Sequence, residues 1–151
     1  MDIKQFQSSF QLLSESVTDL RVSNSFSDYD ERRSAEKHID VSYCIVQVKK
    51  SQKTGFSGTL DLKLAISSEA DGNSFSLSMT LRGVFAAPLK LGEEEFRRMM
   101  RINGCAALYG IARASVGCIS TQFFTVGNIV LPLANFIRFR ELDAGERDND
   151  P

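Results

Sequence analysis

The sequence has little of the chemistry on which most enzyme sites depend. It contains one histidine, His38, and three cysteines, Cys44, Cys105 and Cys118, with no C-x-x-C spacing among them. An odd number of cysteines without that spacing predicts neither a disulfide framework nor a zinc site, so we expect reduced thiols. The stretch "TGFSG" has no Lys-Ser or Lys-Thr after it, so it does not match a phosphate-binding loop. We therefore expect no metal and no cofactor.

Net charge and long apolar runs are also lacking. The 151 residues include 18 Lys and Arg against 19 Asp and Glu, so no overall field attracts nucleic acid or an anionic membrane. No segment approaches the roughly 20 uninterrupted apolar residues of a membrane span. The first residues include an acid and form no apolar signal-peptide core. These absences predict a cytoplasmic protein that neither inserts into a membrane nor binds nucleic acid.

The composition otherwise suits one globular domain over residues 1–151. The apolar content is 42%, and a chain of about 150 residues hides roughly 70% of its unfolded surface without help from disulfides or metal. The tail 141–151 is acidic and has no apolar period beyond Leu142. We expect this tail and the N-terminal segment 1–15 to be flexible.

Four segments carry the period-two alternation of β-strands. They read "VTDLRVSNSF", "HIDVSYCIVQVKK", "TLDLKLAISS" and "FSLSMTLRGVF". A helix-like stripe occupies the first dozen residues, so the first strand is expected to begin near Ser16 or Val17. Asp71-Gly72 is a hairpin signal, and the short links between the last three strands predict an antiparallel meander. One face of that sheet is rich in Leu and Phe and needs a cover.

Two helical patterns follow a break at Pro88. The first starts at Gly92 and has three glutamates in its first turn, where the helix dipole favours anions. Asn103-Gly104 is expected to interrupt it before the second, "CAALYGIARASVGCIS". An unusual stripe of small residues runs along the second helix: Gly110, Ala114, Gly117 and Cys118. Because glycine in a helix costs roughly 1 kcal/mol relative to alanine, the stripe needs a reason, and two stay open: tight packing on the protein's own sheet, or an oligomer interface.

The C-terminal region is rich in phenylalanine. Phe123, Phe124, Phe136 and Phe139 surround the apolar run "NIVLPLANF", which contains Pro132. Aromatic side chains are ordinarily core. These four lie outside the alternation that already fills the inner face of the sheet, so an exposed apolar binding surface is the alternative.

Four stretches resemble the protein-export chaperone family SecB: "FQLLSESVTDL", "GVFAA", "LYGIARASV" and "NIVLPLANF". Positions that match the family include Phe10, Asp19, Arg113, Asn135 and Phe136. Gly110-Ile111 replaces the family's Pro-Tyr pair, and Pro132 is shifted by one position. The sequence is therefore similar to divergent, SecB-like members that are dedicated to particular clients, including toxin-antitoxin partners.

The resemblance implies an α+β fold, with a four-stranded antiparallel sheet, a long helix packed on it and a short C-terminal helix. It implies a homotetramer, assembled as a dimer of dimers with the long helix at the interface. Gly110, Ala114, Gly117 and Cys118 would then lie in that interface. The implied function is that of an ATP-independent holdase, which binds unfolded or non-native polypeptides in apolar grooves for protein export or for a dedicated client such as an antitoxin.

The same resemblance assigns site residues. It assigns client contact to Ile39, Val41 and Tyr43, which would face Phe136 and Phe139 across a groove. Further client-contact residues would be Phe26, Tyr29, Phe123 and Phe124. Asp19 matches an acidic position that the family uses toward the translocation motor SecA. A second acidic position of the family is Ser23 here, which weakens the expectation of that contact.

Two other classes of function stay open. A hotdog-like small enzyme or ligand-binding oligomer, in which a helix also lies against a curved sheet, would need a carboxylate or histidine facing a tunnel. Asp19, Asp61 and His38 are the candidates, and none has a catalytic motif around it. The last alternative is a scaffold that serves assembly only.

Overall fold

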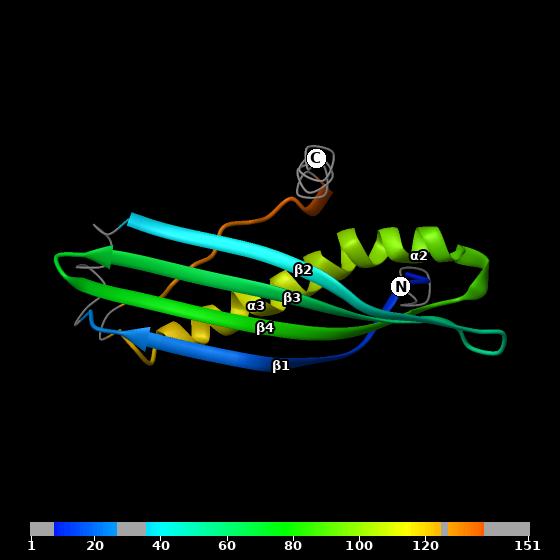
Figure 1. Cartoon of the computed structure of the whole chain (residues 1–151), viewed down its shortest axis with the longest axis horizontal. Coiled ribbons are helices and arrows are strands. Elements are labelled where there is room, and N and C mark those ends of the chain that lie inside the picture. The colour runs from blue at the N-terminus through cyan, green and yellow to red at the C-terminus, as the bar shows by residue number, and fades with distance from the viewer. Residues whose placement is uncertain (1–7, 27–35, 125–126, 138–151) are drawn as a thin grey trace, which may run out of the picture.

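The computed structural model describes residues 8–26, 36–124 and 127–137. Four long strands form one antiparallel sheet: β1 (Gln11–Asn24), β2 (Glu36–Ser51), β3 (Gly55–Ala70) and β4 (Asn73–Ala87). Their order across the sheet is β1-β4-β3-β2. A long helix crosses one face of the sheet (Figure 1). The α+β fold with four antiparallel strands and a packed helix is therefore confirmed.

The last three strands form a meander, and β1 pairs with β4 at the edge opposite to β2. β2 pairs with β3 and β3 with β4, whereas β1 pairs with β4. The hairpin between β3 and β4 turns at Asp71 and Gly72, whose φ angles are 50° and 78°, as the Asp-Gly signal predicts. The connection from β1 to β2 therefore brings the chain from one edge of the sheet to the other.

The strands alternate as predicted, and this alternation places the core. Leu60, Leu62, Leu64 and Ile66 of β3 lie beside Leu81, Met79 and Leu77 of β4 on one face, and all of them are buried. Burying a side chain of this kind contributes roughly 1.5–3 kcal/mol. The opposite face presents serine, threonine and charged side chains to solvent.

The first strand begins earlier than predicted. β1 starts at Gln11, not near Ser16, and residues 11–15, expected in a flexible segment, already pair with β4. Phe10 is buried, and its ring stacks on that of Phe85 at 5.1 Å. The helix-like spacing of the apolar residues was misleading here because tertiary pairing and this aromatic contact decide the conformation.

The helical region after β4 is continuous, so the predicted interruption at Asn103-Gly104 is wrong. A short turn, η2 (Leu89–Leu91), leads into α2 (Glu93–Met99), a π-helical turn η3 (Met100–Gly104) and α3 (Cys105–Ser120). Gly104 lies close against the sheet: a Cβ there would lie 3.1 Å from Leu60 Cδ2. The glycine lets the helix approach the sheet closely, and the wider turn keeps the helix intact.

One side of this helix lies in the core. Phe96 and Met100 come from its first half, and Leu108, Ala112 and Val116 from α3; all five are fully buried. The span Glu93–Ser120, with a mean hydropathy of 1.2 over its most apolar window, is long and apolar enough to cross a membrane by length and composition alone. Core helices pass the same test, and the packing of this helix on the sheet (Figure 1) accounts for its apolar side.

Candidate functional site

An extended segment after α3 is tied to the helix by three hydrogen bonds. The Ile129 N–H donates to Ser120 Oγ at 2.8 Å, Arg113 Nε donates to the Leu131 carbonyl at 2.7 Å, and the Tyr109 hydroxyl donates to the Pro132 carbonyl at 2.9 Å. Ile129 and Leu131 point inward and are buried. Pro132 has no N–H to offer to a strand, and its carbonyl is satisfied by α3. The segment therefore packs on the helix.

The other side of this segment carries apolar side chains that remain in solvent. Val130, Leu133 and Ile137 are 70%, 85% and 60% exposed. Sequence reasoning did not single them out, because Ile129, Val130 and Leu131 form a continuous apolar run with no alternation to separate inward from outward side chains. They add exposed apolar area to this part of the molecule.

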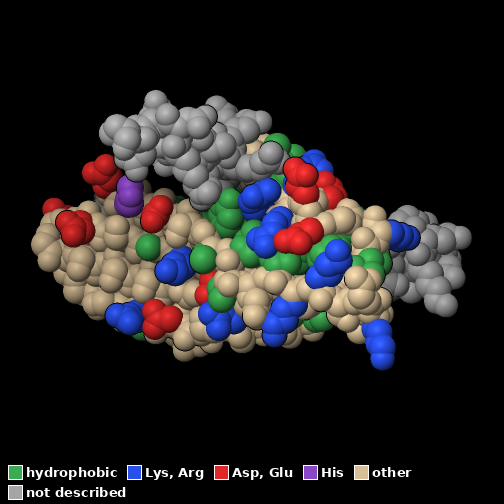
Figure 2. Space-filling model, turned by 45° about the vertical axis from the view of Figure 1, so that its right-hand side comes forward, with side chains coloured by type: hydrophobic (Ala, Val, Ile, Leu, Met, Phe, Trp, Pro, Cys, Tyr) green, Lys and Arg blue, Asp and Glu red, His purple; other side chains and the backbone are tan. Residues whose placement is uncertain are grey.

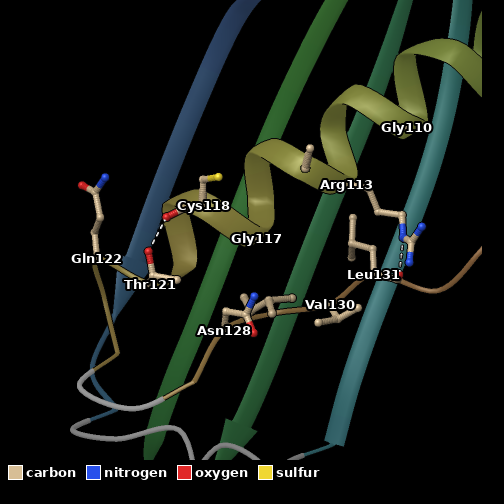
Figure 3. Close-up of a pocket in the computed structure, with 11 residues that line it drawn as sticks. Gly110, Arg113, Gly117, Cys118, Thr121, Gln122, Asn128, Val130 and Leu131 are labelled. Carbon is tan, nitrogen blue, oxygen red and sulfur yellow. Dashed lines mark hydrogen bonds between the residues drawn. The ribbon is translucent and has the colours of Figure 1, made fainter.

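A groove of about 800 Å³ runs between the outward face of α3 and this segment. Figure 3 shows its walls, with Arg113 reaching from the helix to Leu131 and with Asn128 and Val130 on the opposite side. We call it the α3 groove; its lining residues are Gly110, Arg113, Ala114, Gly117, Cys118, Thr121, Gln122, Asn128, Ile129, Val130 and Leu131. Its volume falls in the range of typical ligand pockets, although it is open along its length.

The small-residue stripe faces this groove and not the sheet. Gly110, Ala114 and Cys118 are exposed, and a Cβ on Gly110 would meet nothing within 4 Å. Of the two reasons considered for the stripe, packing against the protein's own sheet is therefore wrong. The second reason, an oligomer interface, stays a prediction.

A second apolar surface lies along β2, at the edge of the sheet. Ile39, Val41, Tyr43 and Ile45 pair in register with the fully covered Ile66, Leu64, Leu62 and Leu60 of β3. Ile39 is 37% exposed, and the other three are half-buried against the core. We call these four side chains the β2 strip. The strip lies at the edge of the hydrophobic core, where its side chains are only partly covered by other apolar residues.

The predicted aromatic contacts divide into core and surface. Phe26, Phe124 and Phe136 are buried, so their assignment to an exposed client surface is wrong. Phe124 packs on Phe75 with 5.4 Å between ring centroids, and Phe136 packs on Tyr109 at 5.5 Å. Phe123 is exposed, with its carbonyl accepting from Asn24 Nδ2. Tyr29 and Phe139 lie outside the described residues. Of the predicted C-terminal helix, the structure describes only Phe136 and Ile137, which are helical, so the rest of that helix stays a prediction.

The candidates for catalysis do not come together. Asp61 forms a two-pronged ion pair with Arg82, with both N–O distances at 2.7 Å, and hydrogen bonding to Asp61 and then its charge raise the pKa of Arg82. His38 pairs in register with Ser67, six residues along β3 from Asp61, which is roughly 20 Å. Asp19 is exposed on β1, 3.4 Å from Arg21. Among the described residues no group of three His, Cys, Asp or Glu could hold a metal ion.

Surface charge is mixed where it can be seen. Figure 2 shows basic and acidic side chains interspersed over one face, with hydrophobic side chains reaching the surface between them and the single histidine exposed. This agrees with the near-zero net charge. It gives no strong field for an anionic partner on that face.

The thiols and the buried Tyr109 have distinct environments. All three cysteines are free, with Cys44 and Cys118 exposed and Cys105 buried. Burial raises the pKa of the Cys105 thiol to about 12, so its place at the start of α3 does not activate it. Burial also raises the pKa of Tyr109, although the charge of Arg113 partly opposes this, and the hydroxyl stays protonated to donate to Pro132.

The comparisons with known proteins bear on the fold alone. No protein-family model matches the sequence, and no characterised protein matches it at sequence level. The arrangement of sheet and long helix is that of a SecB-like chaperone. One solved structure with this arrangement is the SecB-like chaperone Rv1957 of Mycobacterium tuberculosis, in complex with a ChAD peptide from the antitoxin HigA1. It has a TM-score of 0.60 and 11% sequence identity, and the match covers 83% of this chain and 91% of that one.

A second solved structure is similar to a lesser degree. It is a protein of unknown function from Streptococcus agalactiae, with a TM-score of 0.48 and 10% identity over 82% of this chain and 96% of that one. This similarity is too weak to add to the assignment of the fold.

Proposed function

We propose that this protein is an ATP-independent chaperone, a holdase that captures unfolded or non-native polypeptides through exposed apolar surface. The observation that carries the proposal is the β2 strip: a row of Ile, Val, Tyr and Ile at the edge of the sheet that continues the core and is left half-covered. A soluble chain gains nothing in stability from leaving such a row open, whereas contiguous apolar surface is what binds partners.

Client side chains would bind by burying apolar area against this row. Each Å² removed from water contributes roughly 25 cal/mol, and such contacts need no directional groups, so specificity for sequence is low. Ile39, Val41 and Tyr43 are the contact residues that we assign. Phe123, Tyr29 and Phe139 remain predicted additions.

The fold supports this proposal and suggests a type of client. A structure of the same fold has been solved with a peptide from an antitoxin. We infer a client-dedicated role, with an antitoxin segment or an export substrate as the bound polypeptide, in the cytoplasm. Contact with SecA through Asp19 belongs to the export role alone; the exposed position of Asp19 on the outer face of the sheet permits it.

Assembly is part of the proposal. Gly110, Ala114, Gly117 and Cys118 form the outward face of α3, where the absence of large side chains lets a second helix come within the lower part of the usual 8–10 Å range. We infer that α3 of one protomer packs on α3 of another, in a dimer of dimers. The groove beside α3 would then be covered by a second copy.

A light-scattering assay tests the chaperone function. An unfolded client that aggregates on dilution is mixed with the protein at equal molarity, without ATP. Suppression of scattering is expected, and addition of ATP should change nothing. Scattering that rises as fast as with an inert protein at the same concentration would remove the proposal.

A further inference from the structure

Hydrogen-bond donors line one flank of the long helical region. The side chains that face the sheet recur every four residues, at Phe96, Met100, Gly104, Leu108 and Ala112. Residues one position later therefore share a flank of the helix beside the sheet. We call this the donor flank; from the end of the helix toward its start it carries Arg113, Tyr109, Cys105, Arg101 and Arg97.

Two members of the donor flank hold the segment that follows α3. Arg113 donates to the Leu131 carbonyl, and Tyr109 donates to the next carbonyl, that of Pro132. The segment thus passes the helix in the antiparallel direction, and Figure 1 shows it returning from the end of α3 toward α2. The ring of Phe136 packs on that of Tyr109. The described part of the segment ends with the next residue, while Arg101 lies about two turns of helix further on.

Arg101 has no partner in the described part of the chain. Its Nε is buried and makes no hydrogen bond there. The two arginines of the preceding turn differ, because Arg97 pairs with Glu93 and Arg98 with Glu95. A buried charged donor without an acceptor is costly, and native proteins seldom leave one unsatisfied. We therefore expect an acceptor from beyond the described residues, and a carboxylate makes the strongest pair with a guanidinium.

There is space for such an acceptor beside Arg101. A pocket of about 370 Å³ lies there, and Arg98, Glu94 and Glu95 also line it. Because Arg98 is already paired with Glu95, the free positive charge of the pocket is that of Arg101. Glu94 lies seven residues back on the helix, about 10 Å away along its axis. It leaves Arg101 open to another carboxylate.

The same chain supplies carboxylates at a suitable distance. Residues 141–151 contain five acids against one Arg, and Glu141 and Asp143 follow Ile137 by four and six residues. A flexible chain of that length spans roughly 11–14 Å. The eight helical residues from Tyr109 back to Arg101 span about 12 Å. The first acids of the tail can therefore reach Arg101 from the end of the described segment.

From this arrangement we propose that Glu141 or Asp143 of the same chain binds Arg101, so that the start of the acidic tail lies along the donor flank as a strap. The tether favours this acceptor over a separate molecule, because a short flexible link gives it an effective concentration in roughly the millimolar range. The strap continues the order in which the donor flank holds the segment before it. Phe139, between the two anchored points, is then kept close to the helix. The inference does not depend on the chaperone function.

Carbodiimide cross-linking of the full chain identifies the acceptor. Arg101→Lys keeps the positive charge and introduces an amine, which the reagent couples as an amide to a carboxylate in direct contact. Digestion and mass spectrometry then identify that carboxylate. We expect Glu141 or Asp143, with a yield that falls roughly tenfold in about 1 M salt, where the ion pair is screened. Arg98→Lys is the matched control and should couple to Glu95.

A mixture of unlabelled and isotope-labelled protein separates the chain's own tail from that of another copy. A cross-link within one chain joins two peptides of the same isotope, whereas a link between copies also gives mixed pairs. We expect pairs of the same isotope only.

Hydrogen exchange at the Arg101 Nε provides a test with that arginine in place. Removing both acids, by Glu141→Gln with Asp143→Asn, should speed this exchange roughly tenfold or more, because a charged hydrogen bond is lost. Asp148→Asn with Asp150→Asn removes the same charge farther along the tail and should leave the rate within about twofold. Arg101→Lys assigns the NMR signal, which it abolishes.

Three results would overturn the inference. The first is coupling of the introduced amine chiefly to Glu94, or to no carboxylate, while the Arg98→Lys control couples as expected. The second is a large share of mixed-isotope pairs, which would assign the acceptor to another copy. The third is an equal exchange rate at Arg101 in the two doubly substituted proteins. None of these measurements uses a client, so the result is independent of the light-scattering assay.

Discussion

Arg113 Nε lies 2.7 Å from the carbonyl oxygen of Leu131 and donates a hydrogen bond to it across 18 residues of sequence. Leu131 itself is fully buried. This charged donor fixes one wall of the α3 groove, and the Tyr109 hydroxyl fixes the next carbonyl, that of Pro132. These two hydrogen bonds from α3 fix the backbone of the extended segment and thereby hold its exposed side chains, Val130 and Leu133, in position.

Replacing Arg113 with Met should lower the free energy of unfolding by about 1–3 kcal/mol, because the long apolar stem is kept while the Leu131 carbonyl loses its charged donor. Urea unfolding measures the change. Arg97→Met is the matched control: it removes a surface ion pair with Glu93 and should cost at most about 1 kcal/mol. Equal losses in the two variants would mean that the contact with Leu131 does not stabilise the fold.

The β2 strip predicts a difference between neighbouring residues on opposite faces of one strand. Ile39→Lys should raise the concentration needed to suppress client aggregation about fivefold, since roughly 1 kcal/mol of apolar contact is lost. Asp40→Lys adds the same side chain one residue on, where it points to the polar face, and should leave suppression unchanged. Circular dichroism confirms folding of both variants. An equal effect of the two would indicate that charge and not the strip governs client binding.

The outward face of α3 predicts a change in native mass. Ala114→Arg places a long charged side chain in the middle of the small-residue stripe, and we expect the proposed assembly to dissociate into smaller species while the helix content is retained. Ser76→Arg, on the exposed polar face of the sheet, is the control and should keep the native mass. Light scattering coupled to size exclusion gives the result, and an Ala114→Arg protein of unchanged mass would place the interface elsewhere.

The buried thiol predicts a pH dependence of stability. Burial raises the pKa of the Cys105 thiol from its usual value of 9.0 to about 12 in the folded chain, so above about pH 9 the unfolded chain loses this proton while the folded chain keeps it. The free energy of unfolding is therefore unaffected by this thiol below pH 9. It decreases as the pH rises from 9 toward 12, by up to about 1.4 kcal/mol per pH unit. Cys105→Ala should lack this part of the decline. Urea unfolding from pH 8 to 10 compares the two slopes, and parallel slopes would contradict the assignment.

Sequence reasoning succeeded where local pattern and tertiary structure agree. The alternation in β3 and β4 identified Leu60 to Ile66 and Phe75 to Phe85 as the inner face, because period two leaves no choice of side once one face is covered. Asp71-Gly72 placed the hairpin because few other residue pairs adopt its two positive φ angles.

It failed where packing between distant segments decides the outcome. Nothing local indicates that β1 joins β4, since the connection after β1 is long enough to reach either edge. Asn103-Gly104 reads as a break, but the contact between Gly104 and Leu60 makes it a point of close approach. The burial of Phe124 and Phe136 could not be told from the sequence either, because they pack on the rings of Phe75 and Tyr109 from distant parts of the chain.

The π-helical turn sets the rotational phase of everything that follows it. Side chains on the sheet side recur every four residues, at Phe96, Met100, Gly104, Leu108, Ala112 and Val116, whereas a regular α-helix repeats every 3.6. Tightening η3 to a regular α-helix with all its residues kept would turn α3 by about 100°, and the glycine stripe would no longer face outward. The outward direction of the small-residue stripe thus depends on one wider turn in the first half of the helical region.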